Sequence, residues 1–526
     1  MAPVTPPLPS NAPAEVVAMS GQEPRAPVDD PTMGIAVEPG PDAGYAHRIV
    51  TIGDSLTHGF QSAAIYNTDL SYGAIIAYEL GWFDRFRFPR YPGLGGLPLN
   101  IEYLLRELEL RFGPTFSPLE VPLAAFRARG LMNDVEEYWE RGPGAVVPNV
   151  RGFNHALAVF AWDLYDGLHN TFASCQQFAA DPTNNLLIPI VDNAPSRAAL
   201  RVYPHGGPAT EELTLFDVAE KLGDDGGIDT LVVWLGANNV LGSVLRLELA
   251  WSQDDGFRDP AQKVHYTVWD PAHFRLEYDD LVDRVERIDA RNVILCTIPH
   301  VTIPPATRGV FTRPPRSAYF PYYARPWVTD DRFDPESDKH LTAGEACAID
   351  YAIDLYNMHI EDAVRAARTA GRNWYLCDIA GVLDRLAYRR YLERPDAQPS
   401  WWTGPYPLPP ALAAVQPELD TQFLTADGQG GRAKGGLFSL DGVHPTTVAY
   451  GIVAQELIRI MEAAGVTFRT PPGAVRTGPI DVDFDRLIRR DTLISVPPQN
   501  IDSTLGVIGF LDETLDVFAQ LIRGCM

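Results

Sequence analysis

The sequence has few cysteines, and none lies in a pattern that binds metal or forms a disulfide framework. There is no Cys-x-x-Cys pair and no His/Cys cluster, so neither a structural zinc site nor a set of disulfides is indicated. We expect the thiols to be buried packing residues. The five cysteines of the chain are Cys175, Cys296, Cys347, Cys377 and Cys525.

Long apolar runs are also lacking. Every apolar run is interrupted well before the ~18 residues that a bilayer-spanning helix requires. The stretch from Met1 to Pro7 has neither the basic segment nor the continuous apolar stretch of a secretory signal peptide. These absences predict a soluble protein without a transmembrane segment, and they favour a cytoplasmic location.

Basic residues are outnumbered by acidic ones. The 526 residues include 43 Lys and Arg against 68 Asp and Glu, which gives a formal net charge of −25. Such a charge repels phosphate backbones and anionic lipid headgroups, so a nucleic-acid partner is not expected. With 46% hydrophobic and 21% charged residues, the chain has enough apolar material for a large globular core.

Three parts follow one another along the chain. Residues 1–45 are rich in Pro, Ala and acidic side chains without apolar periodicity, which predicts a flexible, disordered tail. Residues 46–466 form the predicted core domain. Residues 467–526 form a C-terminal extension that is rich in turns and then offers a predicted amphipathic helix at Leu505–Cys525.

Short Val/Ile/Leu-rich runs alternate with helix-like segments through the core. This alternation is typical of an α/β fold, a three-layer, doubly wound parallel sheet with helices on both faces. Functional groups in such sheets collect where strands end at their carboxyl side. The expected strands are 48–53, 157–160, 229–236, 292–299 and 374–378, and the clearest helices are 274–290 and 341–370.

Two stretches interrupt the alternation. Residues 303–340 and 395–435 are dense in Pro, Gly and aromatic side chains, which predicts long ordered loops packed by their own rings. They are either surface insertions or walls over a site.

A serine stands where the first expected strand ends, in the run Gly53-Asp54-Ser55-Leu56. A glycine at this point gives the backbone freedom to turn sharply and leave the hydroxyl exposed. Taken alone, a serine in a glycine-rich turn is more often a helix cap than a nucleophile.

Two further groups of polar residues follow much later in the chain. Asp441 precedes His444 by three residues, and Pro445 suits the start of a helix, so both side chains are expected on the loop that enters it. An aspartate so placed can accept the proton on one imidazole nitrogen and leave the other free as a base. Asn238 follows another expected strand, where its amide can donate to an oxyanion.

These blocks together resemble those of the GDSL, or SGNH, hydrolase family, over roughly residues 46–466. The first block is matched by Gly53-Asp54-Ser55-Leu56, and the last by Asp441-x-x-His444-Pro445. The third block is usually Gly-x-Asn-Asp, and here it reads Gly236-Ala237-Asn238-Asn239. The resemblance implies a flavodoxin-like SGNH hydrolase fold, a Ser55-His444-Asp441 triad and no metal or organic cofactor.

The resemblance also implies an oxyanion hole made by the Ser55 N–H, the Ala161 N–H and the Asn238 side chain. Ala161 stands where the family has glycine in its second block, and its N–H serves equally unless the position requires a positive φ, where a methyl is costly. Asn239 replaces an aspartate that in the family mostly supports local structure, so we expect the reaction to survive that change.

The function implied is that of a serine esterase or lipase, which hydrolyses lipid or other acyl esters through an acyl-enzyme, as in lipid metabolism. An acyltransferase or a carbohydrate O-deacetylase could use the same triad. A catalytically silent binding module could keep the same fold, because of the Ala161 and Asn239 departures. The remaining polar candidates are expected to make structural hydrogen bonds, with lining the pocket as the alternative for His58 and shaping the substrate site as the alternative for His300: His58, His155, Asp163 and His300.

Overall fold

The computed structural model describes residues 4–503, apart from residues 39, 41–43, 118, 150–151, 181–189, 205–206, 255 and 471–472. The helix predicted at Leu505–Cys525 lies outside these residues. A parallel five-stranded sheet forms the centre of the molecule, in the order β10-β6-β5-β1-β4. Its strands are β1 (Val50–Gly53), β4 (Ala156–Ala158), β5 (Ile228–Trp234), β6 (Ala290–Cys296) and β10 (Trp374–Cys377).

These strands form because their apolar residues are buried on both faces of the sheet. In β5, Leu231 and Val233 point into one core, whereas Val232 and Trp234 point into the other. A strand buried on both sides reads as a continuous apolar run rather than as an alternation, and all five expected runs became strands of this sheet. The α/β prediction, a parallel sheet flanked by helices, is therefore confirmed.

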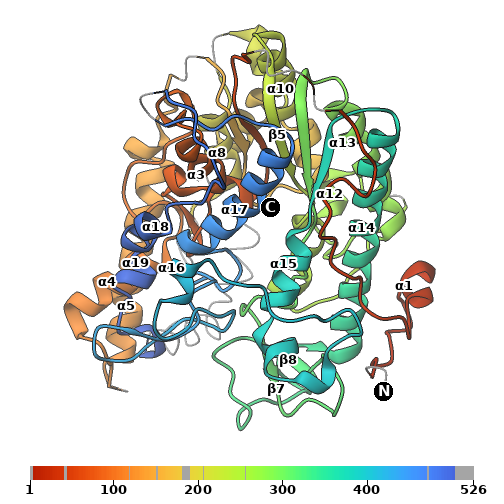
Figure 1. Ribbon diagram of the computed structural model, residues 1–526. Coiled ribbons are helices and arrows are strands. Elements are labelled where there is room, and N and C mark those ends of the chain that lie inside the picture. The colour runs from red at the N-terminus through yellow and green to blue at the C-terminus, as the bar shows by residue number, and fades with distance from the viewer. Residues whose placement is uncertain are drawn as a thin grey trace.

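One face of the sheet is covered by a large set of helices, of which α14 is the longest (Figure 1). The two clearest helix predictions, 274–290 and 341–370, correspond to α13 and α14. The main helices of this layer are α6 (Leu164–His169), α7 (Phe172–Ala179), α8 (Ala194–Val202), α10 (Leu215–Asp224), α11 (Asn238–Arg246), α13 (Pro271–Val285) and α14 (Ala343–Thr369).

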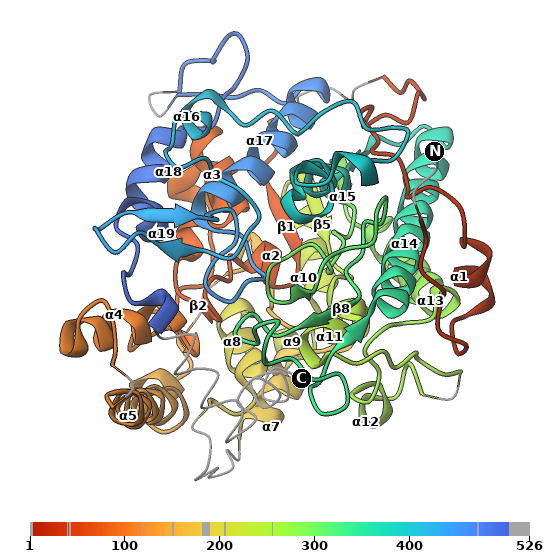
Figure 2. The same ribbon diagram turned by 90° about the horizontal axis from the view of Figure 1, so that it is seen from below.

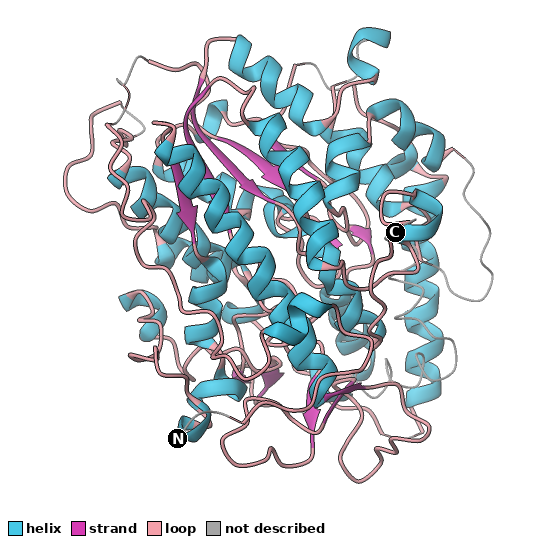
Figure 3. Ribbon diagram, turned by 90° about the vertical axis from the view of Figure 1, so that its right-hand side faces the viewer, coloured by secondary structure: helices cyan, strands magenta, loops and turns pink. Residues whose placement is uncertain are grey.

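The opposite face packs against a smaller group of helices. In Figure 3 the strands lie behind the helices of one layer, so that the sheet is sandwiched within the molecule. The helices of this second layer are α3 (Tyr72–Glu79), α15 (Ile379–Leu386), α16 (Pro410–Ala413), α17 (Thr447–Ala463) and α18 (Phe484–Arg490).

The strand order creates a crevice at the carboxyl edge. Numbered along the chain, the five strands lie in the order 2-1-3-4-5, so that the connections leave in opposite directions from β1 and β5. Gly53 at the end of β1 pairs with Trp234 of β5 and with Ala158 of β4. The residues that follow these three strands therefore meet at one edge, seen near α2 (Ser55–His58) in Figure 2.

Both aromatic insertions contain short strands beside this edge. Residues 303–340 hold β7 (Arg308–Val310) and β8 (Tyr322–Ala324), which form a small antiparallel sheet with β9 (Leu341–Thr342). Residues 395–435 hold the antiparallel pair β11 (Thr425–Ala426) and β12 (Arg432–Lys434). A helical hairpin, α4 (Ile101–Phe112) and α5 (Val121–Glu140), follows the pair β2 (Ala64–Ile65) and β3 (Leu97–Pro98).

The N-terminal segment differs from the flexible tail predicted for residues 1–45. Its described residues run along α14 and the end of β10, and they include the short helix α1 (Ala14–Ala18) with Val16 fully buried. The Arg25 guanidinium, almost completely buried, pairs with Glu361 and lies 3.0 Å from Asp378. Composition missed this order because it arises from ion pairs with residues more than three hundred positions away.

The described part of the C-terminal extension also packs on the core. Phe484 and Leu487 of α18 are buried in the same apolar cluster as α17, and α19 (Thr492–Ser495) follows directly. Among the described residues, no helix combines the length and the apolar character needed to cross a bilayer.

Candidate active site

Ser55 occupies the sharp turn between β1 and α2. Asp54 caps α2 by accepting a hydrogen bond from the Leu56 N–H at 3.0 Å, and Ser55 is the first residue of the helix. A Cβ atom at Gly53 would overlap the Thr57 side chain and the Trp234 carbonyl, so the chain can turn this tightly only with glycine there. The turn leaves the Ser55 hydroxyl at the carboxyl edge, as the sequence predicted.

His444 lies beside this hydroxyl although 389 residues separate the two in sequence. Its Nε2 is 2.8 Å from Ser55 Oγ, and its Nδ1 is 3.0 Å from Asp441 Oδ2. Asp441 and His444 lie on the loop before α17. This helix begins at Thr447, two residues after Pro445, which the sequence placed in its first turn. The structure thus brings the three predicted triad residues into one hydrogen-bonded chain.

The Asp441 carboxylate is fixed by backbone donors on both oxygens. Oδ1 accepts hydrogen bonds from the Val443 and His444 N–H groups, each at 2.8 Å, and Oδ2 accepts one from the Ala63 N–H at 2.8 Å. Burial alone would raise the pKa of Asp441, but His444 and these hydrogen bonds outweigh it and lower the pKa below its ordinary value. The carboxylate is therefore held ionised and oriented toward Nδ1.

The loop that supplies the Ala63 donor is strained, and sequence reasoning missed it. Ser62 and Ala63 both have positive φ, at 51° and 61°. The Ser62 N–H also donates to Ser439 Oγ at 2.9 Å, on the chain leading to Asp441. Consecutive left-handed residues without glycine are uncommon and cluster at functional sites. No local motif marks them, because the contacts that hold them span more than 370 residues.

Ala161 follows β4 with φ at 65°, the conformation that favours glycine. The position therefore does require a positive φ, and the alanine backbone is strained there. The N–H donor is kept, because an alanine in this conformation still carries it. Ala161 lines the same cavity as Ser55 and Asn238.

Replacing Ala161 with glycine should stabilise the protein. The left-handed conformation costs an L-residue about 1–2 kcal/mol, while glycine adds about 0.5–1 kcal/mol of backbone entropy in the unfolded chain. We expect the free energy of unfolding in urea to rise by up to about 1 kcal/mol. The control is Ala158→Gly in β4, which has no positive φ and should be destabilising. An equal decrease in the free energy of unfolding for Ala161→Gly and Ala158→Gly would contradict the claim that Ala161 is strained.

Asn238 and Asn239 open α11 after the glycine turn that ends β5. Asn238 Nδ2 donates to the Trp162 carbonyl at 2.8 Å, which orients the amide and leaves its second hydrogen for another acceptor. Asn239 is fully buried; its Oδ1 accepts from the Leu164 N–H at 3.1 Å and its Nδ2 donates to Glu277 at 3.2 Å. Asn239 thus joins α11 to α6 and α13, which is the structural role expected of it.

Asp54, next to Ser55, is a buried carboxyl group. Only 1% of the residue is exposed, and this burial raises the pKa of Asp54 to about 7. In the unfolded chain its pKa returns to about 3.9. The folded protein therefore keeps a proton that the unfolded chain loses above a pH of about 4, so stability falls as the pH rises from there toward 7.

The variant Asp54→Asn should gain stability relative to the wild type as the pH rises. Asparagine can still accept from the Leu56 N–H but never ionises. Between pH values near 4 and near 8, the difference in free energy of unfolding should grow by up to about 4 kcal/mol in favour of the variant. Urea denaturation across this range measures it. Asp84→Asn removes the same charge from an exposed site and should give a constant difference; a constant difference for Asp54→Asn as well would disprove the shift.

Two cavities meet at Ser55 and His444. The first, which we call the apolar chamber, has about 850 Å³ of space counted out to its open mouth. Apart from Ser55, Thr421 and His444, all of its lining residues are apolar, and they come mainly from α15, α17 and the ends of β5 and β6. Pro304 and Thr421 belong to the two aromatic insertions, so both insertions form walls of this chamber.

The second cavity, which we call the polar chamber, has about 1070 Å³ of space counted in the same way. It contains both predicted oxyanion residues beyond Ser55, and its walls carry charged and aromatic side chains. Besides the triad, its main lining residues are Phe60, Phe160, Ala161, Asp163, Asp166, Asn238, Arg246, Lys263, Tyr266 and Trp269. Sequence reasoning singled out only Ala161, Asp163 and Asn238 among these.

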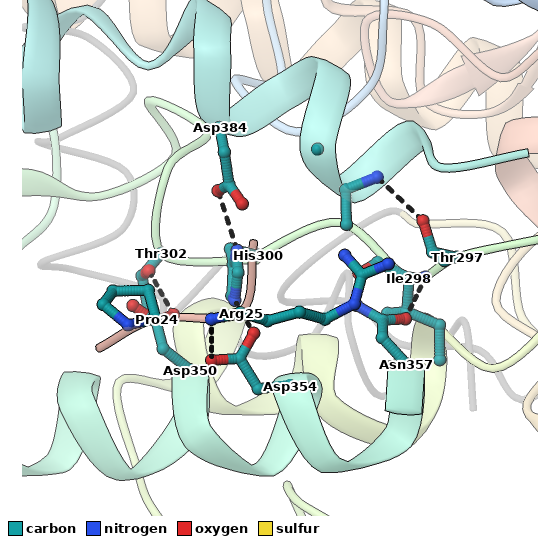
Figure 4. Close-up of polar contacts among 12 residues, drawn as sticks. Pro24, Arg25, Thr297, Ile298, His300, Thr302, Asp350, Asp354, Asn357 and Asp384 are labelled. Atoms are coloured by element: carbon teal, nitrogen blue, oxygen red, sulfur yellow. Dashed lines mark hydrogen bonds and ion pairs between the residues drawn. The ribbon is translucent and has the colours of Figure 1, made fainter. Parts of the chain in front are cut away.

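His300 lies behind the apolar chamber, in a buried network drawn in Figure 4. Its Nδ1 is 2.8 Å from Asp384 and its Nε2 is 3.2 Å from Asp354. Burial would lower the pKa of His300, but the carboxylates outweigh it and raise the pKa well above its ordinary value. Its neighbours Pro299 and Val301 line the chamber, so this ion-paired histidine supports a wall.

The other two histidine candidates make structural hydrogen bonds. His58 Nε2 is 2.8 Å from the Tyr91 hydroxyl, its Nδ1 accepts from the Phe160 N–H at 3.3 Å, and burial lowers its pKa to about 3. His155 Nδ1 accepts from the Arg87 N–H at 2.8 Å, and burial lowers its pKa to about 2. Both rings are therefore neutral.

Within the described part of the chain, no group of three or more His, Cys, Asp or Glu side chains is placed to hold a metal ion. Comparison with known proteins found no matching family model, no matching curated sequence and no matching solved structure.

Proposed function

We propose that the protein is a serine ester hydrolase of the GDSL, or SGNH, type, acting on lipid or other acyl esters. The observation that carries the proposal is the hydrogen-bonded chain Ser55-His444-Asp441 at the carboxyl edge of the sheet, beside an apolar chamber. A base within hydrogen-bond reach of a hydroxyl, itself oriented by a third group, is the arrangement of an activated nucleophile. The 2-1-3-4-5 strand order agrees with a flavodoxin-like SGNH fold.

Acylation begins when Ser55 Oγ attacks the carbonyl carbon of the ester. His444 Nε2 takes the hydroxyl proton as the Oγ–carbon bond forms, and Asp441 stabilises the resulting imidazolium through Nδ1. Collapse of the tetrahedral intermediate breaks the bond between the acyl carbon and the alcohol oxygen. His444 returns its proton to that oxygen, so the alcohol leaves neutral and Ser55 carries the acyl group.

Three donors face the position of the oxyanion in this scheme: the Ser55 N–H, the Ala161 N–H and the Asn238 amide. Ser55 is the first residue of α2, so its N–H has no partner within that helix. The hydrogen bond from Asn238 to Trp162 holds the amide in place before the substrate arrives. Each such donor typically lowers the barrier by about 3 kcal/mol.

Deacylation repeats the cycle with water. His444 takes a proton from water, whose oxygen attacks the acyl carbon, and the Ser55–acyl bond then breaks as His444 returns the proton to Ser55 Oγ. These steps need no metal or organic cofactor.

The test is covalent labelling followed by turnover assays on the full chain. A fluorophosphonate probe should modify Ser55, located by peptide mass spectrometry, and the protein should hydrolyse p-nitrophenyl esters spanning acetyl to long acyl chains. Absence of both labelling and hydrolysis would contradict the proposal and favour a silent binding module. Adding glycerol as an acceptor separates hydrolysis, which releases the free acid, from acyl transfer, which forms a new ester.

A further inference from the structure

The two chambers differ in chemistry on either side of Ser55, and this difference bears on the two halves of an ester. The inference below rests on the proposed serine ester hydrolase. Pockets that bind small molecules are mostly apolar, with a few placed polar groups that fix orientation. The apolar chamber has no charged lining residue, whereas the polar chamber contains Asp163, Asp166, Lys263 and Arg246 besides the triad.

Lys263 is not available to bind an anion. Its Nζ lies 2.8 Å from Asp163 Oδ2 and 2.7 Å from Asp166 Oδ1, and only 10% of its side chain is exposed. Burial disfavours its charge, but the two carboxylates outweigh this and raise the pKa of Lys263 above its ordinary value. The ammonium group is therefore permanently charged and satisfied by two carboxylates.

The second cation of the chamber is Arg246. It donates to the Val264 carbonyl at 2.8 Å, which orients the guanidinium and leaves its charge in place. Counting Asp441, the lining has three carboxylates against two cationic side chains, so its net charge is negative while His444 is neutral. A phosphate entering this chamber would meet a net negative lining, and Lys263 is already paired with two carboxylates.

Neutral hydroxyl groups find suitable partners in the same chamber. The carboxylates of Asp163 and Asp166 accept from Lys263 and from each other's backbone N–H groups, and Asp166 also accepts from Asn170; each oxygen has two lone pairs, so acceptor capacity remains on both residues. Trp269 is 3% exposed, and its indole N–H has no hydrogen-bond partner among the described residues. Tyr266, Trp269 and Phe160 provide apolar surfaces for carbon-bound hydrogens between the hydroxyls.

We propose that the polar chamber binds the alcohol half of the ester, that this alcohol is uncharged and rich in hydroxyl groups, and that the acyl chain occupies the apolar chamber. The substrate class is thus an acyl ester of a polyol such as glycerol or a sugar, without a phosphate near the scissile bond. Asp163 and Asp166 share the single charge of Lys263, so this group of three is net negative, and Asp166 is the member chosen for the test.

The experiment compares three octanoyl esters that share one acyl chain: 1-octanoylglycerol, octanoylglycerol 3-phosphate and p-nitrophenyl octanoate. All are used with the full chain and below their critical micelle concentrations. Burial, together with the Asp163 carboxylate, raises the pKa of Asp166 to about 6, so the assays run about two pH units higher to keep it ionised. We expect kcat/KM for octanoylglycerol to exceed that for its phosphate by at least about tenfold.

The variant Asp166→Asn should reduce this ratio at least about threefold, mainly through a lower KM for the phosphorylated ester. Asp362→Asn, at an exposed position of α14, removes the same charge outside the chamber and should leave the ratio as in the wild type. Because each ratio is internal to one protein preparation, partial loss of folded protein does not change it.

The possible outcomes separate this inference from the proposed function. If the wild type cleaves none of the three esters, the hydrolase proposal itself fails. Suppose that it cleaves p-nitrophenyl octanoate but shows equal kcat/KM for the phosphorylated and the neutral glycerol ester, or cleaves neither glycerol ester. The polyol inference is then overturned, and the hydrolase proposal stands. The polyol inference is also overturned if the wild-type preference persists unchanged in Asp166→Asn.

Discussion

Replacing Ser55 with alanine should reduce kcat for ester hydrolysis by roughly 10⁴- to 10⁶-fold. The hydroxyl lies 2.8 Å from His444 Nε2, and no other hydroxyl shares that contact among the described residues. Without it, no acyl-enzyme forms, and water must attack an ester held only by the oxyanion donors. KM should change much less than kcat, because the two chambers that bind the substrate remain intact.

Initial rates on p-nitrophenyl octanoate, measured over hours with the purified variant, give the residual turnover. The matched control is Ser243→Ala in α11, a fully buried serine whose hydroxyl donates to the Val240 carbonyl of its own helix. This control should stay within about threefold of the wild type. Turnover by Ser55→Ala within tenfold of the wild type would remove Ser55 from the reaction.

The sheet and the triad could be predicted because their signals are local. Each strand is a continuous apolar run, and each triad residue follows such a run or enters a helix, so chain order alone places all three at one edge. The pairing of Gly53 with Trp234 sets the position of Ser55 at this edge, and the loop before α17 brings His444 Nε2 to 2.8 Å from its hydroxyl. The resemblance to the GDSL blocks pointed to the same residues.

The features that the sequence did not reveal depend on contacts between distant segments. Arg25 orders the N-terminal segment through Glu361 and Asp378, and nothing near Arg25 in sequence announces this. The positive φ of Ala63 serves the carboxylate of Asp441, 378 positions later. Lys263 joins the wall of the polar chamber through a hydrogen bond to Asp163, 100 residues earlier. Each is a tertiary interaction that overrides local composition, which is the part of folding that pattern reasoning does not capture.

Replacing Asp441 with asparagine should lower kcat by about 10⁴-fold while leaving KM within a few fold. The carboxylate accepts from Val443 and His444 N–H groups on one oxygen, and it accepts from the Ala63 N–H on the oxygen that contacts His444 Nδ1. An amide has only one acceptor oxygen. Because two backbone N–H groups donate at the Oδ1 position, the amide oxygen of the asparagine should take that position. The NH₂ group then points toward His444 Nδ1.

With that orientation, Nδ1 must accept a hydrogen bond, so the imidazole proton moves to Nε2 and faces the Ser55 hydroxyl. The histidine can then no longer take the serine proton, although all side chains remain in place. The amide NH₂ group also faces the Ala63 N–H, so that this buried N–H loses its acceptor. The loss should lower the free energy of unfolding by about 1–3 kcal/mol. The control is Asp384→Asn beside His300, a buried Asp-His pair outside both chambers, which should lose stability but keep kcat within about tenfold. A loss of kcat no larger for Asp441→Asn than for Asp384→Asn would mean that Asp441 supports the fold without orienting the base.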